Sequence, residues 1–246
     1  MATATFSIWR GDRQGGSFQD YTTEVTEGMV VLDAIHRVQA EQANDLAVRW
    51  NCKAGKCGSC SAEINGDPKL MCMTRLNSLP LEKPVTVEPK RTFPPIKDLV
   101  TDLSWNFEVK KKIKKFKPRP PDAPDGTWRM GQQDVNRVQE FRKCIECYLC
   151  QDVCHVLREH RKFGEFAGPR FFAHLAALEM HPLDTENRAQ DLKDAHGIGY
   201  CNITTCCRQV CPESITITEN AIIPLKERVV DEFYDPLRKI VMRIFT

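Results

Sequence analysis

The chain lacks any hydrophobic run long enough to cross a membrane. Spanning a bilayer takes about 18 consecutive apolar residues, and the most apolar stretches of this 246-residue sequence are the short segments 171–180 and 240–245. The first residues hold neither a basic segment nor a long apolar one, so we expect no secretory signal. The sequence therefore predicts a protein without a transmembrane helix.

The sequence also lacks a strong charge of either sign and the usual marks of a substrate site. A net charge of +2 is too small for binding nucleic acid by charge alone. The basic stretch 110–119 has one aromatic residue, Phe116, and so offers little for bases to stack on. No glycine-rich dinucleotide-binding run and no nucleophile–base set is recognisable. We predict no nucleic-acid partner and no catalytic residue on this chain.

The first hundred residues have the pattern of a small α+β domain. Apolar and polar positions alternate where strands are expected, and apolar residues recur at helical spacing after residue 30. The predicted elements are strands at 3–9, 19–25, 62–64, 70–71 and 85–88, a turn at 11–16 and a helix at 30–43.

The composition then changes. Nine of the fifteen prolines lie between Pro80 and Pro124, which excludes one continuous helix there. Within and beyond this region, helical patterns predict helices at 96–107, 170–180, 184–194 and 222–245. We therefore predict a first domain over residues 1–104, a Pro/Lys-rich linker over 105–130 and an all-α domain over 131–246.

The twelve cysteines form groups with distinctive spacing. The first group is Cys52, Cys57, Cys60 and Cys72. Three thiols from one loop and a fourth from a distant segment are typical of a plant-type [2Fe–2S] cluster. Zinc is the alternative, but zinc sites usually take two close pairs of ligands. Gly55 and Gly58 lie in the loop, where a missing Cβ lets the backbone bend around a cluster.

Two further runs follow the spacing of bacterial ferredoxins. One is Cys144, Cys147, Cys150 and Cys154; the other is Cys201, Cys207 and Cys211, with Thr204 at the second cysteine position. In two-cluster ferredoxins the last cysteine of each run binds the other cluster. This exchange predicts a [4Fe–4S] cluster on Cys144, Cys147, Cys150 and Cys211. It leaves Cys154, Cys201 and Cys207 for a [3Fe–4S] cluster, since a threonine hydroxyl is a poor ligand beside soft thiolates.

Cys206 is left over from this assignment. Its neighbour Cys207 is a predicted ligand, and adjacent side chains on a turn are expected to point in different directions. We interpret Cys206 as a buried, unligated thiol, as free cysteines commonly are. The alternative is that the loop bulges and Cys206 supplies a fourth ligand.

Clusters held wholly by cysteine have no open position for substrate, apart from the three-iron corner, and their natural work is one-electron transfer. The spacing thus predicts a relay whose substrate chemistry lies on another chain. An unassociated ferredoxin, or a relay subunit of a heterodisulfide-reductase-like enzyme, is the alternative interpretation. Thr204 disfavours the latter, because such relays often keep two complete four-iron clusters.

These motifs together resemble the iron–sulfur subunits of succinate dehydrogenase and fumarate reductase over nearly the whole length. Besides the cysteines, the resemblance rests on Gly58-Ser59, Ile64-Asn65-Gly66, residues 93–99 (FPPIKDL), Gly168-Pro169 and Pro212. It implies a plant-type ferredoxin (β-grasp) domain followed by an all-α bacterial-ferredoxin-like domain. It also implies electron flow from FAD of a flavoprotein partner, through the three clusters, to quinone at a cytochrome b-type membrane anchor. The chain would then be peripheral, on the cytoplasmic or matrix face of the membrane.

Three positions depart from the ubiquinone-reducing members of that family. Those members usually have a proline directly after the cysteine that corresponds to Cys154, and this chain has His155 there. Glu159 takes the place of their quinone-contacting tryptophan, and Asn202 takes the place of a histidine that is usual in them. The quinone contacts therefore do not carry over. The resemblance is closer to members that have a di-haem, single-chain anchor and commonly use menaquinone.

Overall fold

The computed structural model describes residues 2–236, which divide into two compact units. The first unit runs to Trp105 and also takes in Ile145–Val153 and Val210–Pro212, and the remaining described residues form the second unit. Both short segments lie within the predicted domain 131–246. The first unit is therefore built from three separate stretches of sequence.

A five-stranded sheet forms the body of the first unit. Its strands are β1 (Ala2–Asp12), β2 (Gly15–Val25), β3 (Ser61–Ile64), β4 (Asp67–Leu70) and β5 (Val85–Glu88), in the order β2-β1-β5-β3-β4. β1 runs parallel to β5, and every other neighbouring pair is antiparallel. The strands predicted at 3–9, 19–25, 62–64 and 85–88 are confirmed. The strand predicted at 70–71 overlaps β4 only at Leu70, because β4 begins at Asp67 and ends there.

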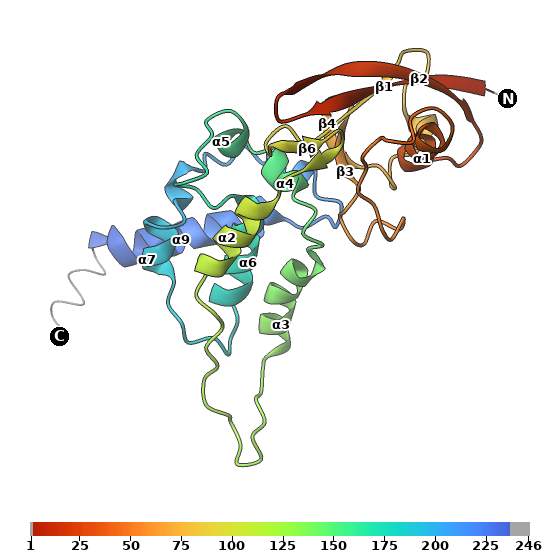
Figure 1. The fold of residues 1–246 in the computed structure, drawn as a ribbon. Helices are drawn as coiled ribbons and strands as arrows, with labels where there is room; N and C mark the ends of the chain where they lie inside the picture. Colours follow the sequence, from red (N-terminus) through yellow and green to blue (C-terminus); the bar gives the residue numbers. More distant parts are fainter. Residues whose placement is uncertain (1, 237–246) are drawn as a thin grey trace. The chain divides into compact units, whose positions relative to one another are not determined.

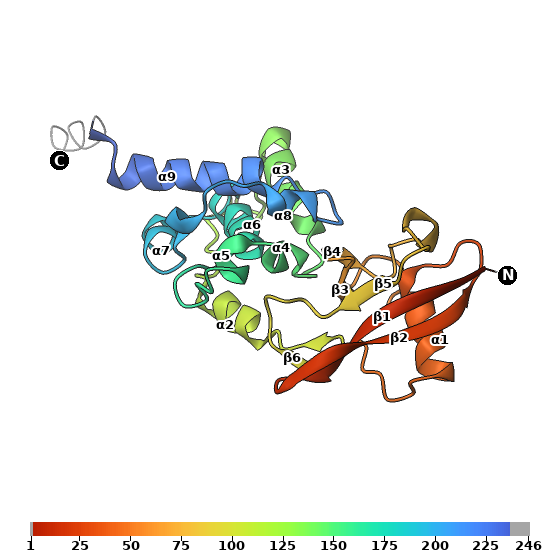
Figure 2. The same ribbon diagram turned by 90° about the horizontal axis from the view of Figure 1, so that it is seen from above.

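Helix α1 (Val31–Glu41) confirms the helix predicted at 30–43 and lies beside β1 and β2 (Figures 1 and 2). The Asp33 carboxylate accepts a hydrogen bond from the Val30 amide at 3.1 Å, which satisfies one of the amides left without a partner at a helix start. The buried residues of α1 pack with β1, β3 and β5 in one core. These residues are Val31, Leu32, Ala34, Ile35 and Val38, with Phe6, Ile8, Ala62, Ile64, Val85 and Val87 from the strands.

The helix predicted at 96–107 is wrong over its first half. Strands β6 (Pro95–Lys97) and β7 (Val100–Thr101) form a small antiparallel pair there, and helix α2 (Ser104–Lys112) begins only afterwards. Asp98, between the strands, has φ +46°, and its carboxylate accepts hydrogen bonds from the amides of Gly11 (3.1 Å) and Ala47 (2.8 Å). Contacts with distant parts of the chain therefore outweigh the local helical pattern.

The short helix α4 (Leu149–Asp152) belongs to the first unit, and the second unit is helical. Besides most of α2, the second unit contains the α-helices α3 (Gln132–Gln139), α5 (His155–Arg158), α6 (Pro169–Glu179), α7 (Ala189–Lys193), α8 (Cys206–Gln209) and α9 (Ile223–Phe233). A wide π-helical turn, Ile217–Ile222, leads into α9. Figure 1 shows the chain between α2 and α3 running out and back as a long loop. None of the helices within residues 2–236 is both long and apolar enough to pass through a bilayer.

Two of the three later helix predictions need correction. Helix α6 confirms the prediction at 170–180. Of 184–194 only Ala189–Lys193 is helical, because the Asp184 carboxylate instead accepts a hydrogen bond from the distant Lys117 amide (3.1 Å). The prediction at 222–245 corresponds to α9 up to Phe233, and its last residues lie outside the described part.

Candidate metal centres

The structure brings the first four cysteines together in the first unit. Cys52, Cys57 and Cys60 lie on the loop between α1 and β3, and Cys72 follows β4. The thiol of Cys57 interacts with that of Cys52, and the thiol of Cys60 with that of Cys72. The backbone amides of Ala54 and Lys56 both donate to Cys52 Sγ at 3.3 Å. Amides aimed at sulfur stabilise the thiolate form that iron requires.

The protonation of these thiols depends on their surroundings. Burial raises the pKa of Cys60 to about 12, and the nearby sulfur of Cys72 adds to that effect. Burial also acts to raise the pKa of Cys57, but hydrogen bonds from Cys52 and Ser59 outweigh it and lower this pKa to about 6. Cys57 is therefore largely a thiolate at neutral pH and suits a first contact with iron.

Gly58 places this loop directly against the next cysteine run. It has φ +68°, a left-handed conformation that favours glycine, and a Cβ added there would come within 2.6 Å of Cys147 Cα. Cys147 also shares the hydrophobic core that contains Cys60 and Cys72. The loop of the predicted [2Fe–2S] site and one ligand of the predicted [4Fe–4S] site are therefore in backbone contact within one unit.

The other predicted [4Fe–4S] ligands are divided by the domain structure. Cys147 and Cys150 are buried beside and on α4, and they share the first unit with Cys211. Cys144 is assigned to the second unit. Among residues 2–236, no three His, Cys, Asp or Glu side chains are grouped tightly enough to hold one metal ion. A polynuclear cluster binds its thiolates through several different iron atoms.

The predicted three-iron ligands meet in the second unit. Cys154, Cys201 and Cys207 line one small cavity, whose other walls include Val156, Phe166, Thr218 and Ile222. The Thr218 hydroxyl lies 3.5 Å from Cys207 Sγ. Three thiols around a cavity with mainly apolar walls fit a cluster that prefers soft sulfur ligands.

Cys206 departs from the sequence prediction. It is half-buried rather than buried, and it lines the same cavity as Cys207 although we expected adjacent side chains to diverge. The cause lies in the loop before α8, where Ile203 and Thr205 both have φ +61°. β-branched residues rarely adopt this conformation, and it turns the chain sharply on each side of Thr204.

Burial keeps the deeper thiols of this cavity protonated until a metal arrives. It raises the pKa of Cys154 to about 12 and that of Cys207 to about 11, and the nearby sulfurs of Cys206 and Cys201 raise both further. Iron bound here must displace these protons, so cluster insertion releases acid.

A buried lysine that the sequence analysis missed lies among the ligands of the first unit. Lys90 is only 4% exposed, and it interacts electrostatically with Asp152, Cys147 and Cys60. Burial lowers its pKa to about 8, although Asp152 and Cys147 act in the opposite direction, so its ammonium group is still charged at neutral pH. Lysine is almost never buried unless it is paired, and nothing in the local pattern marked this one.

Two protein-family descriptions match the chain. One, a 2Fe-2S iron-sulfur cluster binding domain, covers residues 5–108, and the other, a 4Fe-4S dicluster domain, covers residues 140–215. Together with the sheet-and-helix first unit and the helical second unit, they define a two-domain iron–sulfur protein. It joins a β-grasp-like [2Fe–2S] domain to a helical dicluster domain, as the sequence predicted.

Comparison with known proteins indicates which kind of two-domain iron–sulfur protein this chain resembles. The chain is 34% identical to the fumarate reductase iron-sulfur subunit of Mycobacterium tuberculosis (strain CDC 1551 / Oshkosh) over 81% of each chain. It is 30% identical to the succinate dehydrogenase iron-sulfur subunit of Bacillus subtilis (strain 168) over 88% of each. A chain in the structure of the Mycobacterium smegmatis Sdh1 complex in the apo form is 60% identical, with a TM-score of 0.91, covering 95% of this chain and 98% of that one.

The chain belongs to the family of electron-transferring iron–sulfur subunits of succinate dehydrogenase and fumarate reductase. It is thus one subunit of an enzyme complex. This agrees with the resemblance found in the sequence.

Proposed function

We propose that this subunit relays single electrons from FAD in a flavoprotein partner to quinone at a cytochrome b-type membrane anchor. The route we propose uses a [2Fe–2S] cluster on Cys52, Cys57, Cys60 and Cys72, then a [4Fe–4S] cluster on Cys144, Cys147, Cys150 and Cys211, then a [3Fe–4S] cluster on Cys154, Cys201 and Cys207. The anchor would hold the subunit as a peripheral protein on the cytoplasmic or matrix face of the membrane.

The contact between Gly58 and Cys147 is the observation that carries this proposal. Backbone contact between the two ligand loops supports a short path from the first cluster to the second, as electron transfer requires. Lys90 adds to this support, because a buried positive charge near both sets of thiolates stabilises the extra electron on either cluster.

Electron paramagnetic resonance (EPR) of the oxidised complex, purified with its partners, tests the cluster set. Oxidised [2Fe–2S] and [4Fe–4S] clusters are diamagnetic, whereas an oxidised [3Fe–4S] cluster has half-integer spin. We expect a near-stoichiometric signal and about nine irons per chain, the sum over the three cluster types. A silent spectrum with about ten irons would contradict the three-iron terminus.

We also propose that the quinone is a menaquinone, because His155, Glu159 and Asn202 replace residues usual in ubiquinone-reducing relatives. Succinate-dependent reduction of a water-soluble naphthoquinone and of a benzoquinone by the intact complex compares the two classes. We expect a higher kcat/KM for the naphthoquinone. Preference for the benzoquinone would contradict the quinone assignment and leave the relay intact.

A further inference from the structure

The thiol of Cys206 lies next to the one position where this cysteine run has no cysteine. Thr204 takes that place in the spacing. Its hydroxyl oxygen is 3.4 Å from Cys206 Sγ. The chain therefore brings a sulfur atom close to the position that the missing ligand would occupy, from a residue two places further on.

Cys206 also faces the other ligands. It lines the same cavity as Cys154, Cys201 and Cys207. Four cysteines therefore line this cavity, whereas the spacing of the cysteine runs predicts only three ligands there.

The loop that borders this cavity is exposed to solvent. Asn202, Ile203 and Thr204 are exposed, and Cys206 is half-buried. The turns at Ile203 and Thr205 present Cys206 to the cavity without further rearrangement of α8. A small aqueous cation can therefore approach the sulfur of Cys206 in this unit.

We propose that Cys206 is a reserve ligand for a fourth iron, through which the three-iron cluster takes up ferrous ion and becomes a four-iron cluster. This inference rests on the three-iron cluster of the proposed function. It adds an Fe²⁺ site, formed by the Cys206 thiolate and the open corner of that cluster. The occupancy of the site follows the supply of ferrous ion.

Uptake of the ferrous ion needs no added oxidant or reductant. The three-iron cluster must first be in its reduced state, and the electron relay of the complex supplies that electron. Cys206 Sγ forms a bond to the incoming Fe²⁺, and the thiol proton passes to water. The core changes from [3Fe–4S]⁰ to [4Fe–4S]²⁺, so the positive charge gained equals the charge of the ion and no electron is transferred. Loss of the ferrous ion and reprotonation of Cys206 reverse it.

The test uses the assembled complex and two variants. Cys206→Ala removes the proposed ligand, and Thr204→Val keeps Cys206 while replacing the neighbouring hydroxyl by a methyl group of similar size. Each complex is reduced with dithionite under argon, incubated with ⁵⁷Fe²⁺, desalted, reoxidised with a mild quinone and examined by EPR and Mössbauer spectroscopy. Both readouts report the cluster rather than turnover.

We expect the oxidised three-iron signal of the wild type and of Thr204→Val to fall at least fivefold, with one ⁵⁷Fe gained per chain. Cys206→Ala should keep its signal and gain no iron. An undiminished signal in the wild type, or an equal loss in Cys206→Ala, would overturn this inference and leave the relay standing. Absence of the signal from all three proteins before iron is added would overturn the three-iron cluster of the proposed function as well.

Discussion

Lys90 is a positive charge that the fold keeps away from water. Burying an ammonium group is costly unless an opposite charge lies nearby, and here the Asp152 carboxylate provides it, with the ligand thiols of Cys147 and Cys60 close by. When those thiols hold clusters, each cluster carries a net negative charge that grows by one on reduction. A fixed cation in this position therefore favours the reduced state of both neighbouring clusters.

Replacing Lys90 by methionine should lower the midpoint potentials of the [2Fe–2S] and [4Fe–4S] clusters. The expected decrease is on the order of tens of millivolts, as for charges that interact across an effective dielectric constant of about 20. EPR-monitored redox titration of the complex measures it. Lys83→Met removes an exposed lysine of the same unit and should leave both potentials unchanged. Potentials that stay constant or rise in Lys90→Met would contradict this role.

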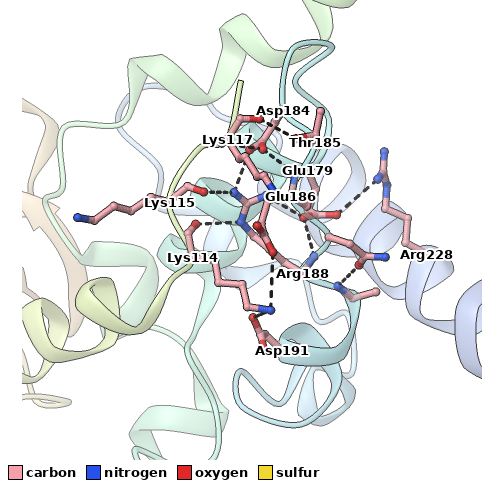
Figure 3. A network of polar contacts seen from close by, with 12 residues as sticks. Lys114, Lys115, Lys117, Glu179, Asp184, Thr185, Glu186, Arg188, Asp191 and Arg228 are labelled. Carbon is pink, nitrogen blue, oxygen red and sulfur yellow. Dashed lines mark hydrogen bonds and ion pairs between the residues drawn. The ribbon is translucent and has the colours of Figure 1, made fainter. Parts of the chain in front are cut away.

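Arg188 joins several segments of the second unit into one network (Figure 3). Its side chain is fully buried and pairs with Glu179 at 3.1 Å and with Asp184 at 2.9 Å. It also donates to the backbone carbonyls of Lys114 (3.0 Å) and Lys115 (2.8 Å). The guanidinium thus connects the end of α6, the start of α7 and the chain that follows α2.

Arg188→Met should destabilise the second unit by about 3–5 kcal/mol. It removes the shared cation of two buried carboxylates, of which Glu179 keeps only a longer contact of 3.6 Å with Arg228. Thermal denaturation of the complex, followed by circular dichroism, would show a clearly lowered midpoint. Lys111→Met is the matched control: its ion pair with Glu108 is exposed on both sides and should contribute about 1 kcal/mol at most. Equal midpoints for the two variants would rule out a structural role for the network.

The basic stretch 110–119 is less free than its composition suggests. Lys114 pairs with Asp191 at 2.9 Å, and Arg119 pairs with Asp122 at 2.5 Å. Part of its charge therefore holds the second unit together.

His196, which follows α7, links the stability of the second unit to pH. It is 2% exposed. Burial lowers its pKa, nearby Lys112 and Lys114 lower it further, and Asp191 acts in the opposite direction. The folded state therefore resists protonation of His196, whereas the unfolded chain accepts a proton near pH 6.5. Its contribution to stability is complete above that pH and is lost as the pH falls below it.

His196→Gln should consequently show a smaller loss of thermal stability than the wild type between about pH 7.5 and pH 5.5. The quantity compared is the change of the thermal unfolding midpoint with pH. A variant whose midpoint is shifted equally at every pH therefore does not affect the comparison. His155→Gln serves as the control, because it removes a less buried histidine of the same unit. Parallel slopes for wild type and His196→Gln would refute the assignment.

The sequence allowed the regular parts of the fold to be predicted where local pattern and packing agree. Alternation identified β1 and β2, and helical spacing identified α1 and α6. Prediction failed at 96–107, where Asp98 is held by Gly11 and Ala47, and at 184–188, where Asp184 is held by Lys117 and Arg188. In each case a carboxylate accepts hydrogen bonds from amides far away in the sequence, Gly11 and Ala47 for Asp98 and Lys117 for Asp184, which no local window contains.

The candidate cluster ligands were easier to predict from the sequence than the helices and strands, because they depend on the spacing of the cysteines. Cysteine intervals suggested which thiols share a cluster, and the structure brings together Cys52 with Cys57, Cys60 with Cys72, and Cys154 with Cys201 and Cys207. The position of Cys206 could not be predicted, because it depends on positive φ angles at Ile203 and Thr205. Threonine and isoleucine give no sequence signal for such turns.

Over the whole chain, the clusters would reverse the sign of the net charge. The sequence alone has a net charge of +2 and a pI near 8.0. Each oxidised cluster with its thiolates carries a formal charge of about −2, so three would bring the net charge to roughly −4. Isoelectric focusing of this subunit with clusters intact and after their removal should therefore show an acidic shift in the loaded form. An unchanged pI would contradict the number of clusters.

The interleaved first unit has a consequence for how the protein is made. Residues up to Trp105 leave the ribosome first, but the unit is completed only by Val210–Pro212, about 100 residues later. At bacterial and eukaryotic elongation rates of about 5–20 residues per second, that delay lasts roughly 5–20 s. The loop with Cys52, Cys57 and Cys60 can therefore receive iron and sulfide while Cys211 has not yet been synthesised. All four predicted ligands of the [2Fe–2S] site are therefore synthesised well before the last predicted ligand of the [4Fe–4S] site.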